Sequence, residues 1–137
     1  MALTHLVDTS AITRLSQPSV RAAVETLAVT GRVARAVISD LEVGFSARST
    51  PEWDSLQRAL GAFQLIALEA RHVRRALQVQ RLLAARSQRG RKVPDLLVAA
   101  AAEEAGLTVL HYDADFDRIA AVTSQECEWV VPAGSIA

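Results

Sequence analysis

The chain has 137 residues, 50% of them hydrophobic, and its 15 basic and 15 acidic side chains balance to a formal net charge of zero. This length favours a single domain, residues 1–137, with a substantial core. The longest stretch without a formal charge, residues 59–68, is too short to cross a bilayer, and Asp8 comes too early for a signal peptide. A lone cysteine, Cys127, is expected to be a small core hydrophobe rather than a nucleophile. We therefore expect a cytoplasmic protein.

Apolar segments alternate with polar breaks along the whole chain. Strands are expected at residues 3–7, 35–38, within 63–68, at 108–112 and at 127–131. Helices are expected at about 10–15, at 17–28, from Ser39 or Asp40 onward, from 49–52 onward, at 70–87, at 94–105 and at 116–121. Strands that alternate with helices predict an α/β fold in which a parallel sheet lies between helical layers.

The helix that starts at residues 49–52 has the clearest local signals. Its Ser-Thr-Pro-Glu sequence combines a capping-box pattern with an early proline. Trp53, Leu56, Leu60 and Phe63 then recur at helical spacing. We expect this apolar stripe to belong to the core rather than to a cofactor site.

Four acidic residues fall where an apolar segment ends or a helix begins: Asp8, Glu42, Asp95 and Asp113. The C-terminal ends of parallel strands meet at one edge of a sheet, where ligands usually bind. Carboxylates gathered there repel one another by about 3 kcal/mol per pair at roughly 5 Å and an effective dielectric of 20. A divalent cation that prefers oxygen ligands, such as Mg²⁺, would stabilise such a cluster.

Each acid also has a simpler explanation when it is taken alone. Asp8 could be a helix N-cap, and Asp95 could merely complement a helix dipole. Glu42 could be an ordinary first-turn acid, and Asp40 competes with it for any role. The joint occurrence of the acids at these boundaries is what favours a functional site.

Basic residues are concentrated in one segment. Residues 70–94 contain eight basic side chains and no acid, whereas from Asp95 onward eight acids accompany the single basic residue Arg118. Two interpretations remain open: a solvated face of an arginine-rich helix, or a stripe that binds a polyanion beside an acidic pocket.

Four segments of the chain together resemble a known family. They are Val7-Asp8-Thr9-Ser10, Asp40-Leu41-Glu42-Val43-Gly44, Pro94-Asp95-Leu96-Leu97-Val98-Ala99 and Asp113-Ala114-Asp115-Phe116. In this order and spacing they resemble the PIN domain, and more narrowly the VapC-type toxin ribonucleases of bacterial toxin–antitoxin pairs. The resemblance covers nearly the whole chain, and it implies a three-layer α/β/α fold with a short, mainly parallel central sheet.

Carried over position by position, the resemblance implies that four residues are the catalytic acids: Asp8, Glu42, Asp95 and Asp113. Asp8, Asp95 and Asp113 match the main metal ligands. Glu42 would bind metal directly or orient its water. Asp115 matches a further acid, which would help to form a second, weaker metal site.

Other positions are expected to support these acids or to bind the substrate. Ser10 or Thr9 matches a polar residue that supports the first acid. His111 stands where many members have Thr or Ser, and we expect it either to act behind the metal ligands or to contact RNA. Arg91 and Lys92, just before the third acid, are the candidates for holding phosphate.

The resemblance implies a toxin that is a Mg²⁺- or Mn²⁺-dependent endoribonuclease, cuts structured RNA (tRNA or rRNA) and inhibits translation. The metal would activate water for in-line attack on a phosphodiester. Aromatic residues make up only 4% of the chain, so shape and phosphate contacts are expected to matter more than base stacking. The implied partners are a VapB-type antitoxin, which would dock on the helices that carry Val43, Trp53 and Leu56, and a second copy of the toxin. The chain would thus form a homodimer and a hetero-oligomer with the antitoxin.

Two other functions fit part of the pattern. A PIN-like protein-binding module that no longer cleaves would share the fold, but the acids present at all four positions argue against it. A flavodoxin-like receiver would also gather acids at strand ends, but it needs an acidic pair after its first strand and a lysine on a late strand. Lys92 is the only lysine, and it lies in a basic loop.

Overall fold

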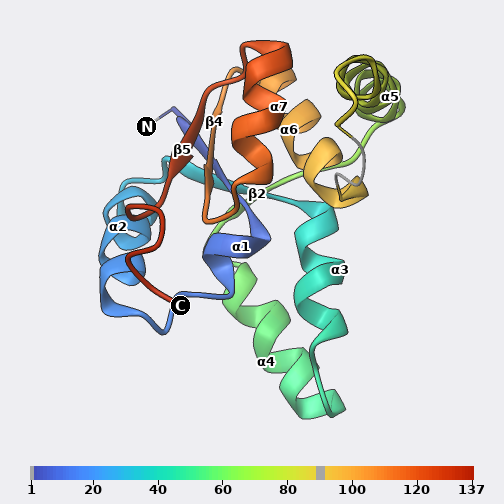
Figure 1. The fold of residues 1–137 in the computed structure, drawn as a ribbon. Helices are drawn as coiled ribbons and strands as arrows, with labels where there is room; N and C mark the ends of the chain where they lie inside the picture. Colours follow the sequence, from blue (N-terminus) through green and yellow to red (C-terminus); the bar gives the residue numbers. More distant parts are fainter. Residues whose placement is uncertain (1, 89–91) are drawn as a thin grey trace.

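The computed structural model describes residues 2–88 and 92–137. Within those ranges, five strands form one parallel sheet with the spatial order β3-β2-β1-β4-β5 (Figure 1). The strands are β1 (His5–Val7), β2 (Val33–Ala36), β3 (Gln64–Ile66), β4 (Thr108–His111) and β5 (Cys127–Trp129). β1 is central, and the chain builds outward from it, first through β2 and β3 and then, on the other side, through β4 and β5.

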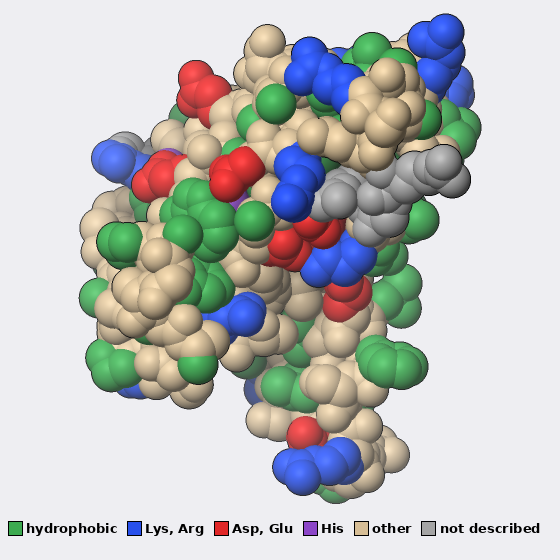
Figure 2. All heavy atoms as spheres, in the orientation of Figure 1, with side chains coloured by type: hydrophobic (Ala, Val, Ile, Leu, Met, Phe, Trp, Pro, Cys, Tyr) green, Lys and Arg blue, Asp and Glu red, His purple; other side chains and the backbone are tan. Residues whose placement is uncertain are grey.

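Seven helices lie in the same described ranges and connect or follow the strands. They are α1 (Thr9–Ile12), α2 (Pro18–Val29), α3 (Val37–Phe45), α4 (Thr50–Leu60), α5 (Ala70–Ala85), α6 (Val93–Ala105) and α7 (Asp115–Thr123). Helices α5, α6 and α7 cover one face of the sheet, and α1 and α2 cover the other, so the predicted three-layer fold is confirmed. Helices α3 and α4 pack against each other, and Figure 2 shows their far end as a lobe that stands out from the molecule.

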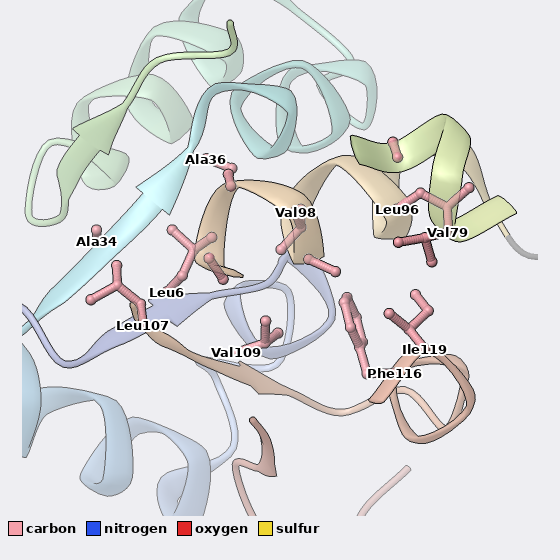
Figure 3. Close-up of a cluster of buried hydrophobic side chains, with 14 of the residues drawn as sticks. Leu6, Ala34, Ala36, Val79, Leu96, Val98, Leu107, Val109, Phe116 and Ile119 are labelled. Atoms are coloured by element: carbon pink, nitrogen blue, oxygen red, sulfur yellow. The ribbon is translucent and has the colours of Figure 1, made fainter. Parts of the chain in front are cut away.

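The alternation of side chains along the strands creates two cores, one on each face of the sheet. Leu6 and Val109 pack with Phe116 and the other buried residues of α5, α6 and α7 (Figure 3). Val7 and Leu110, the next residues along β1 and β4, belong to the opposite core. Because successive side chains of a strand point to opposite faces, two short apolar strands are enough to serve both cores.

The prediction of a strand at residues 35–38 is wrong for residues 37 and 38. β2 ends at Ala36, and α3 begins at the next residue, so the two expected caps, Ser39 and Asp40, lie inside the helix. The last two residues of the expected strand are β-branched, which favours a strand locally. An ion pair at the junction supports the helical start instead, because Nε of Arg35 donates to Oδ1 of Asp40 at 2.8 Å.

The start of α4 at residues 49–52 is confirmed, with the serine hydroxyl accepting from the backbone N–H of the glutamate at 3.2 Å. The apolar stripe of this helix is only partly core. Leu60 and Phe63 are buried, but Trp53 is 48% exposed. Trp53 lies instead against Gly44 of α3, where a Cβ would come within 2.7 Å of the indole Nε1. The glycine thus permits the close approach of the two helices.

Cys127 lies at the edge of the core, partly buried against the α5–α7 layer. Burial, with a smaller effect of the Asp117 charge, raises the pKa of its thiol to about 12. A thiol with this pKa forms almost no thiolate at neutral pH, as expected for a small core hydrophobe.

The structure also bears on membrane insertion. Within residues 2–88 and 92–137, no helix has both the length and the apolar character needed to span a membrane.

Candidate metal centre

The adjacent strands β1 and β4 lie where the strand order of the sheet reverses, and hydrogen bonds connect the segments that follow them. Asp8 directly follows β1, and Tyr112 and Asp113 follow β4. The backbone N–H of Asp8 donates to the carbonyl of Leu110 at 2.9 Å, and that of Tyr112 donates to the hydroxyl of Ser10 at 2.9 Å. Open α/β sheets bind ligands at such a switch point.

Asp8 caps α1 and is almost completely buried. Its Oδ2 accepts from the backbone N–H of Ser10 at 2.9 Å. Burial raises the pKa of Asp8, the hydrogen bonds from Ser10 oppose that rise, and the nearby charge of Glu42 adds to it. The N-cap explanation is therefore correct for Asp8, and the same residue also lines the cavity described below.

Asp95 lies in the first turn of α6 and is only 4% exposed. In the described part of the chain, its Oδ2 has no hydrogen-bond partner, and Nζ of Lys92, 3.8 Å away, is too distant to be one. Burial and then the charge of Asp8 raise the pKa of Asp95 to about 7. A buried carboxylate oxygen without a donor costs free energy, and a cation placed there would recover it.

Asp113 and Asp115 complete a tight group with Asp95. One ligand atom from each of the three carboxylates lies within 4.8 Å of the others. The backbone N–H of Asp115 donates to Oδ1 of Asp113 at 2.9 Å, and Nζ of Lys92 donates to its Oδ2 at 2.6 Å. Burial alone would raise the pKa of Asp113, but these hydrogen bonds outweigh burial and lower it. Lys92 thus supplies positive charge among the acids.

Glu42 reaches the site from the second turn of α3, one turn further along the helix than predicted. Its Oε1 accepts from the hydroxyl of Thr9 at 2.7 Å, and the same hydroxyl lies 2.9 Å from Oγ of Ser39. The two candidate supports of the first acid therefore have different partners. Ser10 holds Asp8 through its backbone, whereas Thr9 holds Glu42.

The four sequence-distant acids line one cavity of about 470 Å³. On the face shown in Figure 2, acidic and basic side chains gather near the region where α1, α3 and α6 approach one another in Figure 1. The residues that line the cavity are Asp8, Thr9, Ser10, Thr13, Arg14, Glu42, Lys92, Asp95, Tyr112, Asp113 and Ala114. Asp8 and Glu42 are not members of the group formed by Asp95, Asp113 and Asp115, so the carboxylates are arranged in two parts.

This donor set fits a hard divalent cation. Its ligand atoms are carboxylate oxygens, which Mg²⁺ and Mn²⁺ prefer over nitrogen or sulfur ligands. Oδ2 of Asp95 has no hydrogen-bond partner among the described residues, and Asp95 lines the same cavity as Asp8 and Asp113. A cation bound there would satisfy this oxygen and reduce the repulsion among the acids.

His111 is completely buried, so the expectation that it contacts RNA is wrong. Its Nδ1 accepts from the backbone N–H of Asp113 at 3.1 Å, which requires the proton of the neutral ring to be on Nε2. The ring packs between Phe116 and Trp129 at centroid distances of 4.9 and 5.0 Å. Burial lowers the pKa of His111 and favours this neutral form. The residue fixes the loop that carries Asp113.

Of the two residues expected to hold phosphate, Arg91 lies outside the described residues and Lys92 lies in the cavity. Two other arginines of the basic segment form ion pairs within the protein. Arg71 pairs with Glu69, the N-cap residue of α5, and with Glu104 of α6, whereas Nε of Arg75 lies 2.6 Å from Oε1 of Glu103. These two arginines are therefore less available to bind a polyanion than the sequence suggests.

Sequence reasoning missed Arg14, a second basic residue of the cavity. It is half-buried in the turn after α1 and donates from Nη1 to the carbonyl of Ser10 at 2.7 Å. The available signal was its position four residues after Ser10, which places both on one side of a helical turn.

A family model for the PIN domain matches residues 5–122, and the chain therefore belongs to the PIN domain family. The resemblance to the VapC-type proteins is confirmed as well. The chain is 68% identical over 136 residues to ribonuclease VapC51 of Mycobacterium tuberculosis, with 99% of each chain covered. It is 43% identical over 141 residues to ribonuclease VapC21 of the same species, with 98% of this chain and 99% of the relative covered.

A solved structure supports the same fold. The DNA-bound VapBC of Salmonella typhimurium matches with a TM-score of 0.79, 94% of this chain and 99% of that chain being covered. Because the sequence identity is only 16%, this likeness bears on the fold and not on the chemistry.

Proposed function

We propose that this chain is the toxin of a type II toxin–antitoxin system and acts as a metal-dependent endoribonuclease. The observation that carries the proposal is the group formed by Asp95, Asp113 and Asp115, which shares an edge of the sheet with buried Asp8. Two relatives with 68% and 43% identity are named ribonucleases, which supports the same activity.

The metal is Mg²⁺ or Mn²⁺. Asp8, Asp95 and Asp113 are its main ligands, and Asp115 helps to form a second, weaker site. When bound, the metal supplies a nucleophilic water and neutralises charge on the phosphodiester. Lys92 adds a further positive charge beside Asp113, where a phosphate oxygen would approach.

The chain's own residues position the reacting groups. Thr9 fixes Oε1 of Glu42, which leaves Oε2 to orient the attacking water through a hydrogen bond. The backbone of Ser10 holds Asp8, and the ring of His111 holds the backbone of Asp113. These contacts fix the carboxylates before the substrate arrives, so little reorganisation is needed on binding.

The substrate is a structured RNA, either tRNA or rRNA, whose cleavage inhibits translation. The cavity lining includes one aromatic residue, Tyr112, so it offers little surface for stacking successive bases. Its two basic residues, Lys92 and Arg14, suit contacts to the sugar–phosphate backbone. Arg91 remains a candidate for a further phosphate contact.

The partners are a VapB-type antitoxin and a second copy of the toxin, and the complex acts in the cytoplasm. Solved structures with this fold include VapBC complexes, some of them bound to DNA. The antitoxin docks on α3 and α4, which expose large apolar side chains at Leu41, Phe45 and Trp53. Val43, by contrast, is buried and cannot contribute to that surface.

Cleavage of a structured RNA by the purified chain tests the activity. Mg²⁺ or Mn²⁺ should support cleavage and EDTA should stop it. Asp95→Asn should lower the rate at least about 100-fold because it removes a metal ligand, while the fold persists. Asp8→Asn should also abolish the metal-induced rise in melting temperature. Equal cleavage by the wild type and both variants would assign the activity to a contaminant and reject the proposal.

The toxin assignment has a separate test. Expression of the chain alone should arrest growth, and co-expression of its antitoxin should relieve the arrest. A clustered carboxylate site suits an antitoxin arginine, which presents five donors and a positive charge. Changing that arginine to Ala should weaken the inhibition. Normal growth on expression of a protein that cleaves RNA in vitro would reject the toxin assignment and leave the nuclease assignment intact.

A further inference from the structure

In the part of the chain that the structure describes, Arg14 and Lys92 are the basic side chains that line the acidic cavity, and only Lys92 is paired with a carboxylate side chain. Lys92 donates to the carboxylate of Asp113, so part of its charge is neutralised within the protein. Arg14 donates to two main-chain oxygens, those of Ser10 at 2.7 Å and Ala137 at 3.1 Å. Among the residues that the structure describes, no carboxylate side chain forms an ion pair with Arg14.

The guanidinium of Arg14 also keeps donors available toward the cavity. An arginine side chain has five N–H groups, and the two backbone contacts use one on Nε and one on Nη1. Three N–H groups remain, spread over Nη1 and Nη2. Two N–H groups of one guanidinium match two oxygens of a phosphate, which is the usual bidentate arrangement.

The local structure holds Arg14 in a fixed place relative to the acids. Its guanidinium carbon lies 4.9 Å from the centroid of the Tyr112 ring. The hydroxyl of Tyr112 donates to the carbonyl of Ile136 at 2.8 Å and accepts from the N–H of Ile136 at 3.2 Å. These hydrogen bonds fix the segment that contacts Arg14. Ser10, whose carbonyl accepts a hydrogen bond from Arg14, donates its backbone N–H to the carboxylate of Asp8. Such anchoring reduces the entropy lost when a ligand binds.

Other arginines of the protein show what an internally neutralised guanidinium looks like. Nε of Arg35 lies 2.8 Å from a carboxylate oxygen of Asp40, and Nε of Arg75 lies 2.6 Å from one of Glu103. These residues join secondary-structure elements and do not line the cavity. Arg14 differs from them because it lines the acidic cavity and, among the described residues, pairs with no carboxylate side chain.

We propose that Arg14 is a substrate-binding residue that holds an RNA phosphate next to the one cleaved at the carboxylates. This inference rests on the proposed ribonuclease function and adds a second point of contact on the RNA backbone. The carboxylates and their metal act on one phosphodiester, and the guanidinium holds a neighbouring phosphate through two parallel N–H···O hydrogen bonds. The RNA is then fixed in direction across the site, as in-line attack requires.

The test compares Arg14→Gln with wild type in RNA cleavage over a range of salt concentrations. Because each phosphate contact contributes about 0.7 to 0.9 to the slope of log affinity against log salt, the variant should lose about that much of the slope. KM should rise about tenfold to a hundredfold, as expected for loss of hydrogen bonds to a charged group, while kcat changes little. The metal-induced rise in melting temperature should remain.

Two further variants separate phosphate binding from a structural role. Arg21→Gln is the matched control, since Arg21 also donates to two backbone carbonyls, of Leu15 and Ser16, but lies outside the cavity lining. It should leave KM and the salt slope unchanged. Arg14→Lys keeps the charge and should restore the salt slope, with only part of the affinity.

Three results would overturn the proposal. Unchanged KM and salt slope in Arg14→Gln would show that this side chain does not bind phosphate. A loss of kcat together with the metal-induced stabilisation would show a structural role, as would equal losses in Arg14→Gln and Arg14→Lys. Failure of the wild type to cleave or bind RNA is a different outcome, because it rejects the ribonuclease function itself.

Discussion

The two sides of the acidic cavity hold their carboxylates in different ways. On the β1–α3 side, Asp8 and Glu42 accept hydrogen bonds from neutral donors, the backbone of Ser10 and the hydroxyl of Thr9. On the α6–β4 side, which comprises Asp95, Asp113, Asp115 and Lys92, three carboxylates lie close together.

On that α6–β4 side, the ammonium of Lys92 compensates part of the charge of Asp113, while one oxygen of Asp95 stays unpartnered. Neutral hydrogen bonds fix the first side without a cation, whereas the second side remains electrostatically strained. The comparison teaches that repulsion among carboxylates is concentrated on the α6–β4 side, whereas burial raises the pKa of Asp8 on the other side.

The largest expected effect is the pH dependence of stability in the presence of EDTA. The pKa of Asp95 is raised from 3.8 to about 7, so the native state binds more protons than the unfolded state between these values. The contribution of Asp95 to stability is complete below about pH 4 and is lost as pH rises through about 7, by on the order of 4 kcal/mol. Asp95→Asn should flatten this part of the profile, measured by urea unfolding at each pH. An unchanged profile would contradict a strained α6–β4 side.

The second effect is stabilisation by metal. A site that binds only the native state adds about 2.7 kcal/mol at a metal concentration of 100 times the Kd. Asp113→Asn should lose most of this gain because it removes a main ligand. Glu42→Gln should keep most of it, because Thr9 holds Glu42 in place to orient water and Glu42 is not one of the main ligands. Thermal unfolding with and without Mn²⁺ measures the gain, and equal losses in both variants would show that Glu42 is a main ligand as well.

The third effect concerns the hydroxyl of Thr9. Thr9→Val keeps the shape of the side chain but removes the donor to Glu42 and the contact with Ser39, at a cost of about 1 to 2 kcal/mol. Cleavage should slow because Glu42 is no longer fixed. Thr13→Val is the matched control, since the described hydrogen bond of its side chain is an exposed one of 3.5 Å to a backbone carbonyl. Denaturant unfolding should separate the two variants, and similar losses would show that the contact of Thr9 is unimportant.

The smallest effect on stability is expected for Lys92→Met. The side chain of Lys92 is 58% exposed, so its ion pair with Asp113 contributes less than about 1 kcal/mol to stability. Because a cation near the site repels a metal ion, the variant should bind Mn²⁺ up to about thirtyfold more tightly, as about 2 kcal/mol between a divalent and a single charge at 4 Å in water implies. RNA binding should weaken at the same time. Calorimetric titration with Mn²⁺ measures the first change, and weaker metal binding would show that Lys92 supports the ion.

The sequence predicts the β1–β4 edge of the site better than the parts contributed by α3. Asp8 and Asp113 were found because a carboxylate after an apolar strand is visible locally, and parallel strands bring such positions together. The start of α3 was misplaced because two β-branched residues after Ala36 look like a strand. Their conformation is decided by packing and by the ion pair of Arg35 with Asp40.

Other features depend on contacts between distant segments and leave no local signal. Arg75 looked available for a polyanion, but it pairs with Glu103 once α5 packs against α6. Arg14 carries no sequence signal because its partners are main-chain oxygens, which every residue type has. The side chain of His111 could have faced RNA or the core, and only the packing of Phe116 and Trp129 decides that it is buried.

The pairing of β1 with β4 has a consequence for the timing of activity during protein synthesis. Val7 pairs with Leu110, so the first acid meets the last two only after all the segments between these strands have been made. A nascent chain that ends before β4 lacks Asp113 and the strand that holds it beside Asp8. Contacts so distant in sequence also form late and slowly in folding. A ribosome making this protein is therefore not exposed to its nuclease activity until β4 and Asp113 have been translated and have reached β1.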